Sequence, residues 1–219
     1  MMHIDHNSYG TLAVVFLVSA IIIYAGFKLV NPVWLKWSIA VIMWVFCIWQ
    51  LAFFRVPDRV PAGNDKIVTS AADGKVVIVD TFFEDEYLHR ECKRVCVYMN
   101  FFDVHANFWP VTGEVSYYKY HPGKHLLAFK PKASLDNEHA SACIVTPDGQ
   151  EVFFKQLAGV FARRIVNYSK PGLKVESGRQ CGIIKFGSRL DMFLPLDAEV
   201  KVKVGDLTTA AETVIATLR

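Results

Sequence analysis

Three residues in separate segments of the 219-residue chain could carry out chemistry. Ser188 follows Gly187 inside the apolar run CGIIKFGSRLDMFLP, His105 lies in DVHAN, and Asp73 lies in ADGKV. A serine hydroxyl can act as a nucleophile, a histidine can transfer protons near neutral pH, and a carboxylate can orient a base. Each also has a plainer interpretation: a β-bulge or kink at the Gly-Ser pair, a strand histidine and a turn aspartate.

Motifs of the common enzyme classes are absent from the sequence. It contains no GxGxxG, P-loop, GxSxG or HExxH pattern, which argues against nucleotide binding and against the usual hydrolases and zinc proteases. Cys92 and Cys96, with His89 nearby, lack the second ligand pair that a metal site requires, so we predict no metal. The five cysteines show no disulfide-framework spacing, which fits a reducing compartment.

Two apolar segments near the N-terminus predict a membrane hairpin. Residues 10–27 and 37–54 each run for 18 residues without a charge, close to the length that spans hydrocarbon. Asn31-Pro32 interrupts the helix between them. A secretory signal is disfavoured, because the first eight residues hold no Lys or Arg. Two buried helices of a globular core are the other alternative.

The two apolar runs and the proline-bounded segment after them divide the chain into three parts: a hairpin (1–54), a linker (55–65) and a domain (66–219). Basic residues after the second span favour a cytoplasmic position for the domain at the cell membrane, although two lysines between the spans argue for the opposite side. From residue 55 onward the chain has 22 basic and 20 acidic residues and no basic run, so nucleic acid is not an expected partner.

The domain is predicted to be mainly β, in the α+β class. Runs rich in β-branched and aromatic residues recur, and Pro147-Asp148-Gly149 predicts a hairpin turn between two of them. Helical spacing of apolar residues predicts one helix in QLAGVFARRIVNYS. The last 20 residues before the terminal Arg219 resemble half of a lipoyl or biotinyl carrier domain, without its modified lysine.

Four segments resemble the phosphatidylserine decarboxylase family, in its short membrane-associated bacterial and archaeal branch. KFGSRLDMFLP is similar to the branch's FGSR(V/L)D(V/M)(Y/F)LP element, ADGKV to its ADG-x-V element, and the segment from Val104 to Gly113 to V-H-x-N-x-x-P-x-x-G. The fourth match comprises Lys132-Ala133-Ser134, Asn137-Glu138-His139, Gln156-x2-Gly159 and Ala162-Arg163-Arg164-Ile165. Together they cover residues 66–219 in the family's order.

The resemblance implies a pyruvoyl-dependent decarboxylase that cuts itself before Ser188. The cut would give a β chain of residues 1–187, ending at Gly187, and an α chain of residues 188–219, which stay together as a heterodimer or a larger oligomer. Ser188 would become the pyruvoyl group, which forms a Schiff base with phosphatidylserine of the membrane and releases CO2 to leave phosphatidylethanolamine. The resemblance implies neither pyridoxal phosphate nor a metal.

The same resemblance suggests roles for the other residues. Asp73 would belong to the self-cleavage machinery and His105 would be a general acid or base. Longer relatives carry a second histidine where this chain has Phe108, so either His105 serves both steps or another group such as His139 is the base.

Arg163, Arg164 and Arg189 could hold the lipid phosphate or the serine carboxylate, while a solvated helix face explains the first two equally well. Two other functions stay open: a membrane-anchored lipoyl-like adaptor without activity, and a decarboxylase of another serine-headed lipid such as archaetidylserine.

Overall fold

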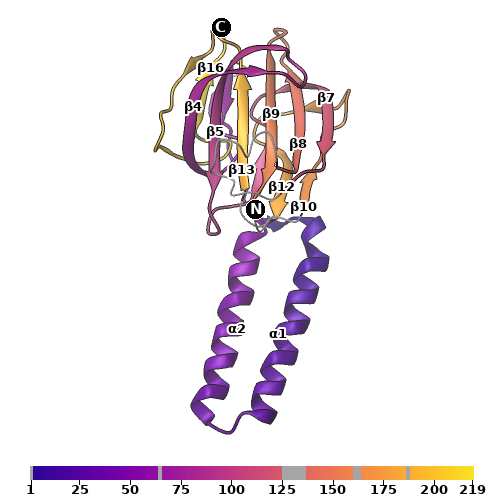
Figure 1. Cartoon of the computed structure of the whole chain (residues 1–219), viewed down its shortest axis with the longest axis vertical. Coiled ribbons are helices and arrows are strands. Elements are labelled where there is room, and N and C mark those ends of the chain that lie inside the picture. Colours follow the sequence, from indigo (N-terminus) through magenta and orange to yellow (C-terminus); the bar gives the residue numbers. More distant parts are fainter. Residues whose placement is uncertain (1, 64–65, 125–136, 160–163, 186–187) are drawn as a thin grey trace. The chain divides into compact units, whose positions relative to one another are not determined.

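The structure is a computed structural model that describes residues 2–63, 66–124, 137–159, 164–185 and 188–219. The chain divides into two compact units, Met1–Pro57 and Asp58–Arg219, each of which is described by itself (Figure 1).

The first unit is a helical hairpin. Its elements are β1 (His3–Ile4), the short 3-10 helix η1 (His6–Ser8), α1 (Tyr9–Leu29), α2 (Val33–Phe53) and β2 (Arg55–Val56), with β1 antiparallel to β2. The helices touch where Gly26 of α1 meets Ile39 of α2, since a Cβ at Gly26 would lie 3.3 Å from the Ile39 Cδ1 atom. Gly26 therefore allows the two helices to approach closely.

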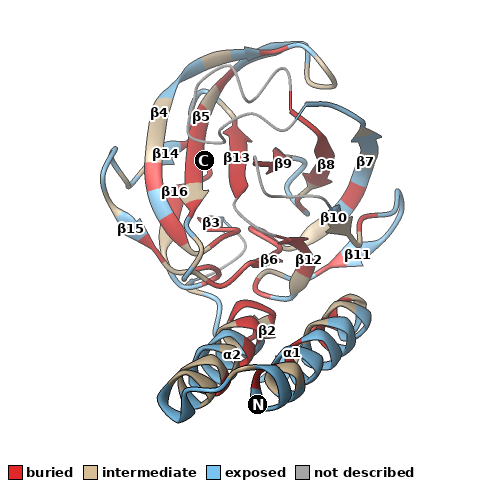
Figure 2. Ribbon diagram, turned by 60° about the horizontal axis from the view of Figure 1, so that its bottom comes forward, coloured by how far each residue is buried: buried red, intermediate tan, exposed pale blue. Residues whose placement is uncertain are grey.

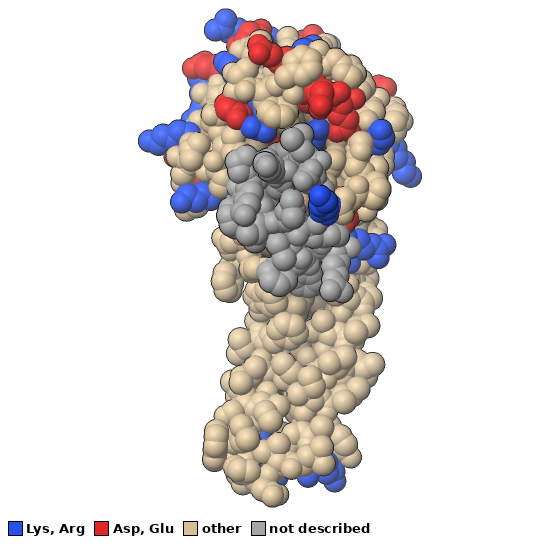
Figure 3. All heavy atoms as spheres, in the orientation of Figure 1, with Lys and Arg blue, Asp and Glu red and all other residues tan. Residues whose placement is uncertain are grey.

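The predicted hairpin is confirmed, and its helices are longer than expected. The break between them covers only residues 30–32, so Lys28 and Lys36 lie on helices and not in a connecting loop. The segments His6–Leu29 and Val33–Phe53 are long and apolar enough to cross a membrane. Their surface is uncharged along most of its length in Figure 3, and basic side chains appear near the turn between them. These features are compatible with membrane association.

The second unit is built from antiparallel strands. Among its described residues, an eight-stranded sheet has the order β11-β7-β8-β9-β13-β5-β4-β15, and two three-stranded sheets have the orders β10-β12-β6 and β14-β16-β3. The strands are β3 (Ile67–Thr69), β4 (Gly74–Glu84), β5 (Arg90–Met99), β6 (Ala106–Phe108), β7 (Gly113–His121), β8 (His139–Val145), β9 (Glu151–Ala158), β10 (Arg164–Asn167), β11 (Lys174–Val175), β12 (Gln180–Lys185), β13 (Ser188–Leu194), β14 (Glu199–Val200), β15 (Leu207–Thr208) and β16 (Val214–Thr217).

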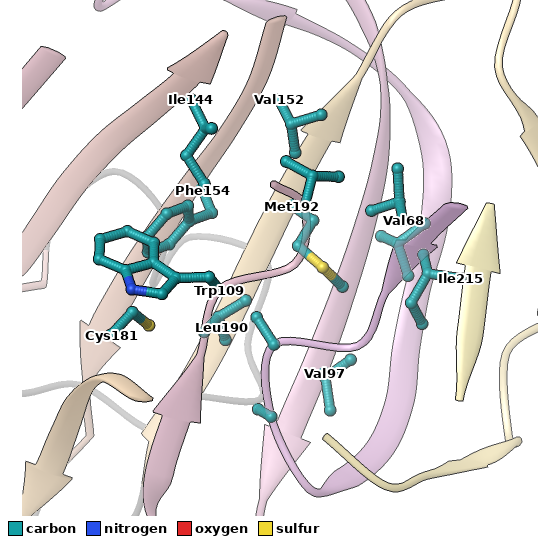
Figure 4. Close-up of a cluster of buried hydrophobic side chains, with 14 of the residues drawn as sticks. Val68, Val97, Trp109, Ile144, Val152, Phe154, Cys181, Leu190, Met192 and Ile215 are labelled. Carbon is teal, nitrogen blue, oxygen red and sulfur yellow. The ribbon is translucent and has the colours of Figure 1, made fainter. Parts of the chain in front are cut away.

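The large sheet curls around the hydrophobic core, and its central strands β5, β13, β9 and β8 are buried along most of their length (Figure 2). Side chains alternate between the two faces of a strand. Leu190 and Met192 of β13 face the core together with Val97, Phe154 and other apolar side chains (Figure 4). Arg189 and Asp191 alternate with them and therefore project from the other face.

The mainly β fold is confirmed, but the predicted helix in QLAGVFARRIVNYS is wrong. Its beginning belongs to β9 and its end to β10. Leu157 and Ala158 pair with β13 on one side of β9, and Leu157 also pairs with β8 on the other. A short apolar run is compatible with the period of a helix and with that of a strand. Here the pairing of the segment within a buried sheet outweighs its helical spacing.

The predicted turn at Pro147-Asp148-Gly149 is confirmed, and it joins β8 to β9. Thr146 N–H donates to the Gln150 carbonyl oxygen at 2.9 Å, and Gly149 adopts a φ of 79°. Glycine suits this position because it adopts positive φ without steric cost.

Candidate active site

Ser188 lies at the point where the chain passes from one sheet to another. It is the first residue of β13 in the eight-stranded sheet, whereas β12, which ends at Lys185, belongs to a three-stranded sheet. The Gly-Ser pair therefore does not interrupt one continuous strand. Gly187, the predicted partner in the cleaved bond, lies outside the described residues.

The Ser188 side chain is buried on the core face of the sheet. Its neighbours across the ladder are Met99 on β5 and Ala158 on β9. The Ser188 hydroxyl donates to the Met99 Sδ atom at 3.1 Å. A thioether is a weak acceptor, so this contact orients the hydroxyl while leaving the oxygen lone pairs able to attack.

A chain of side-chain amides runs through the core beside Met99. Asn107 Nδ2 donates to the Met99 Sδ atom at 3.7 Å, and Gln156 Nε2 donates to Asn107 Oδ1 at 2.7 Å. Asn167 Nδ2 in turn donates to Gln156 Oε1 at 2.7 Å. These bonds connect β6, β9 and β10, and each amide fixes the orientation of the next. Asn107 and Gln156 lie in the matched segments, but the sequence assigned them no role.

Gly182 on β12 makes room for this amide chain. A Cβ atom at Gly182 would lie 2.2 Å from the Val166 carbonyl oxygen and 2.9 Å from Gln156 Nε2. Both distances are too short for a side chain, so glycine is required for β12 to pack against β10 and Gln156.

His105 directly precedes β6 and is fully buried. Its carbonyl oxygen accepts from Ile184 N–H of β12 at 3.2 Å, and its Nδ1 atom lies 2.9 Å from the Asp103 carbonyl oxygen. Because a carbonyl only accepts, Nδ1 carries the hydrogen, and Nε2 holds the lone pair of a neutral ring. Burial lowers the pKa of His105 to about 4, although the hydrogen bond to Asp103 opposes this shift. His105 is thus a neutral base at pH 7.

The strand pairing separates His105 from His139, the other candidate base. Leu157 pairs with both His139 and Arg189, while Ala158 pairs with Ser188. Since paired residues share a face and successive residues alternate, His139 lies on the face opposite Ser188. His105 shares its face of the extended chain with Asn107, whose amide contacts Met99. This arrangement favours His105.

Asp73 immediately precedes β4, at the end of the sheet where Ser188 begins β13. Arg59 Nη2 lies 2.9 and 3.2 Å from its two carboxylate oxygens, and Ala210 N–H donates to Oδ1 at 2.7 Å. Asp73 therefore joins three distant segments of the chain. Its predicted part in self-cleavage stays a prediction.

The three predicted arginines differ in position. Arg189 is fully buried, and its Nε and Nη2 atoms donate to the two carboxylate oxygens of Asp191 at 2.7 and 2.9 Å. This pair already neutralises the charge of Arg189. Arg164 is exposed at the start of β10, directly across from Lys185 on β12. Arg163 lies outside the described residues.

A second polar cluster occupies the face of the sheet opposite Ser188. Lys155 Nζ lies 3.0 Å from Glu84 Oε1 and 2.8 Å from Glu86 Oε2, and His121 Nε2 lies 2.8 Å from Glu86 Oε1. Burial by itself raises the pKa of Glu86, but hydrogen bonds from His139, Lys155 and His121 outweigh it and hold that pKa well below its usual range.

Glu86, His121 and His139 place their ligand atoms within 4.8 Å of one another, a grouping that could hold a cation. Both Glu86 oxygens, however, already have donors in the chain: Tyr117 and His121 at Oε1, and Lys155 and Ser141 at Oε2. The expected absence of a metal stays a prediction.

Lys155→Met should lower the free energy of unfolding by about 3 kcal/mol, because it leaves two carboxylates buried without their cation. This corresponds to a fall of roughly 6–12 °C in the melting temperature of the detergent-solubilised full chain at pH 7. The variant should also lose stability less steeply below pH 4.5, since Lys155 helps to keep the pKa of Glu84 and of Glu86 low. Lys201→Met, which breaks an exposed pair with Glu199, is the control and should shift the melting temperature little.

Comparison with known proteins finds matches over most of the chain. The family profile described as phosphatidylserine decarboxylase matches residues 46–216. A protein named phosphatidylserine decarboxylase proenzyme from Amoebophilus asiaticus is 45% identical over 169 residues, which cover 77% of this chain and 75% of the relative. Proteins of the same name from Cytophaga hutchinsonii and Parabacteroides distasonis are 41% identical over 182 residues (83% of each chain) and 36% identical over 218 residues (99% of each chain).

Proposed function

Because the chain belongs to the phosphatidylserine decarboxylase family, we propose that it removes CO2 from the serine headgroup of phosphatidylserine and leaves phosphatidylethanolamine. The observation that carries the assignment to particular residues is the position of Ser188, which is buried at the junction of two sheets with its hydroxyl bonded to the Met99 sulfur.

Self-cleavage begins at the Ser188 hydroxyl. Its oxygen attacks the carbonyl carbon of Gly187, the amide bond breaks, and an ester joins Gly187 to the Ser188 side chain while the Ser188 nitrogen becomes a free amine. Loss of the Ser188 α-proton then breaks the bond between Cβ and the ester oxygen and releases residues 1–187 with a carboxylate at Gly187. The elimination leaves dehydroalanine at position 188. Water then adds to this residue, its nitrogen leaves as ammonia, and a pyruvoyl group remains.

His105 is the proposed base for the first step. Its Nε2 lone pair can accept the hydroxyl proton of Ser188, and the Asp103 carbonyl oxygen holds the ring in the required tautomer. The site fits a pyruvoyl group, since that group forms from Ser188 itself, between its neighbours Met99 and Ala158 on the adjacent strands. When formed, the group supplies the carbonyl that binds the serine amine and the electron sink for decarboxylation. His105 can return a proton to the substrate carbon.

Arg164 and Lys185 form the proposed anion site, together with Arg163. The two residues lie directly opposite each other on neighbouring strands, so a single anion could interact with both cations. The phosphodiester or the carboxylate of phosphatidylserine offers such an anion. Arg189 is a weaker candidate, because it is fully buried and its charge is neutralised by Asp191. Asp73 is proposed to position the segment before β4 through its bonds to Arg59 and Ala210.

The hairpin is proposed to tether the enzyme in the cell membrane with its catalytic unit on the cytoplasmic side. Tethering raises the local concentration of a substrate that resides in the bilayer without any new contact to the site. After cleavage, the chains of residues 1–187 and 188–219 are proposed to remain associated.

Intact-mass analysis together with a lipid assay tests this function. Purified protein should contain chains of 187 and 32 residues, the smaller one beginning with a pyruvoyl group, and should convert phosphatidylserine in vesicles to phosphatidylethanolamine. A single 219-residue chain without turnover would contradict the proposal and favour the adaptor. Turnover of archaetidylserine but not of phosphatidylserine would show that the substrate is a different serine-headed lipid, while the proposed reaction stays the same.

His105→Gln should slow self-cleavage by roughly 100-fold or more, the usual contribution of a positioned general base. The measurement is the fraction of cleaved chain against time after synthesis. His139→Gln is the matched control and should be cleaved at the normal rate, because His139 lies on the other face of the sheet. Rapid cleavage of His105→Gln, with slow cleavage of His139→Gln, would reverse the assignment.

His105 also predicts an acid-sensitive fold. Its pKa of about 4 lies below its ordinary value of 6.5, so the unfolded chain binds a proton more readily. The resulting stability is complete above pH 6.5 and declines by up to about 3 kcal/mol as the pH falls to 4. In the uncleaved Ser188→Ala background, His105→Gln should flatten this part of the melting-temperature profile. An unchanged profile would show that His105 is not buried in the neutral form.

A further inference from the structure

A rigid turn beside the candidate active site displays an aromatic side chain. Residues 100–103, here called the Phe102 turn, follow the end of β5 at Met99. Asn100 N–H donates to Asp103 Oδ2 at 2.8 Å, Phe102 N–H donates to Asn100 Oδ1 at 2.8 Å, and Asp103 N–H donates to the Asn100 carbonyl oxygen at 3.1 Å. These three bonds fix the backbone of the turn.

Phe102 at this turn is 81% exposed, more than any other phenylalanine that the structure describes. A single exposed apolar side chain is ordinary in a folded protein. A binding role for Phe102 must therefore be argued from the residues that surround it.

The turn adjoins the proposed catalytic groups on both sides. Met99, just before it, accepts the hydrogen bond of the Ser188 hydroxyl, and the carbonyl oxygen of Asp103 holds the His105 ring. The His105 carbonyl oxygen is bonded to Ile184 N–H, which places the turn near the end of β12 and its residue Lys185. The exposed Phe102 ring and the exposed Arg164, which lies opposite the buried Lys185, therefore occupy the same end of the domain.

We infer that the Phe102 turn enters the bilayer interface and brings the active site against the lipid headgroups. The inference rests on the proposed function, because a substrate whose acyl chains stay in the bilayer requires the site to meet the interface. Phosphatidylserine is anionic, and the exposed Arg164 complements that charge while the Phe102 ring enters the apolar boundary. The occupant is a lipid surface rather than a second protein.

Spin labelling tests the location of Phe102 directly. The five native cysteines are buried and free, so a cysteine introduced by Phe102→Cys should be labelled selectively, with the unmodified chain as background. Phe83→Cys is the matched control: Phe83 is 55% exposed and lies at the opposite end of the β4–β5 ladder, paired with Glu91. The full chain is reconstituted in vesicles that contain phosphatidylserine.

The nitroxide at position 102 should collide more with oxygen, which concentrates in lipid, than with a water-soluble nickel chelate. The nitroxide at position 83 should show the opposite order. Equal access of the nickel chelate to both positions would overturn the inference. This measurement needs no turnover, so it stands even if the proposed function fails.

A kinetic comparison separates contact with the bilayer from an effect on His105. Phe102→Ser should lower turnover of phosphatidylserine in vesicles by about fivefold, the change that corresponds to 1 kcal/mol of lost interfacial binding. Turnover of a short-chain phosphatidylserine dissolved as monomers should stay normal, and Phe83→Ser should be normal with both substrates. An equal loss on both substrates, or no loss on either, would overturn the inference. Absence of turnover by the wild-type chain would instead contradict the proposed function.

Discussion

Replacing Ser188 with alanine should leave one uncleaved chain of 219 residues and abolish decarboxylation. The variant lacks the oxygen that must attack Gly187, and without the cut no carbonyl exists to act as the electron sink. We expect the loss of activity to exceed that of every other substitution in the site. Intact mass and the release of CO2 from phosphatidylserine vesicles measure the two effects.

The Ser188→Ala chain should nevertheless fold. The hydroxyl makes a hydrogen bond to a weak sulfur acceptor, and alanine fits the same buried space, so the melting temperature should stay close to that of other uncleaved variants. Ser177→Ala, on the segment before β12, is the matched control and should be cleaved and active. Decarboxylation at the normal rate by Ser188→Ala would refute both the cleavage site and the electron sink.

Breaking the Arg189–Asp191 pair should produce the largest loss of stability. Both side chains are completely buried, and the carboxylate accepts two hydrogen bonds from the guanidinium. Asp191→Ala leaves a buried cation without its partner, which costs about 3–5 kcal/mol. We expect the melting temperature of the full chain to fall by roughly 6–20 °C, measured in the Ser188→Ala background so that all chains compared are uncleaved.

Asp80→Ala is the matched control for this prediction. Asp80 also forms a two-point pair with an arginine, Arg94, but its side chain is 41% exposed. Solvent can replace the lost carboxylate there, so the cost should stay near 1 kcal/mol or below. A double variant, Arg189→Met with Asp191→Leu, should recover part of the stability because it removes both charges. Equal melting temperatures for Asp191→Ala and Asp80→Ala would contradict the claim that burial makes the loss of the carboxylate more costly.

The parts of the fold that depend on local composition could be predicted from the sequence. Eighteen uncharged residues in each span predict the two helices, and the ends differ from the structure by only a few residues. The Asp148-Gly149 turn predicts the β8–β9 hairpin for an equally local reason. The helix predicted after Gln156 failed because local spacing does not show that β13, about 30 residues further on, pairs with that segment.

The candidate site could be predicted as a set of residues but not as an arrangement. Ser188 and His105 follow from their motifs, whereas the register between distant strands places His139 on the opposite face. The pair between Arg189 and Asp191 could not be predicted, although the two residues are close in sequence. A carboxylate two residues from an arginine is common in strands and does not by itself indicate an ion pair. The amide bond between Asn107 and Gln156 joins residues 49 positions apart, so it emerges only when the sheets are packed.

The place of β13 within the large sheet has a consequence for the life of the molecule. β13 lies between β5 and β9 and pairs over seven residues with the first and six with the second, and β15 and β16 of the same short fragment pair with β4 and β3. The proposed cut would therefore free the end of a central strand that stays enclosed on both sides. The uncut precursor would form these strand pairs as one continuous chain. Once denatured, the mature enzyme would have to reinsert a 32-residue peptide into the middle of a sheet, so its lifetime is governed by the rate of unfolding rather than by a reversible equilibrium.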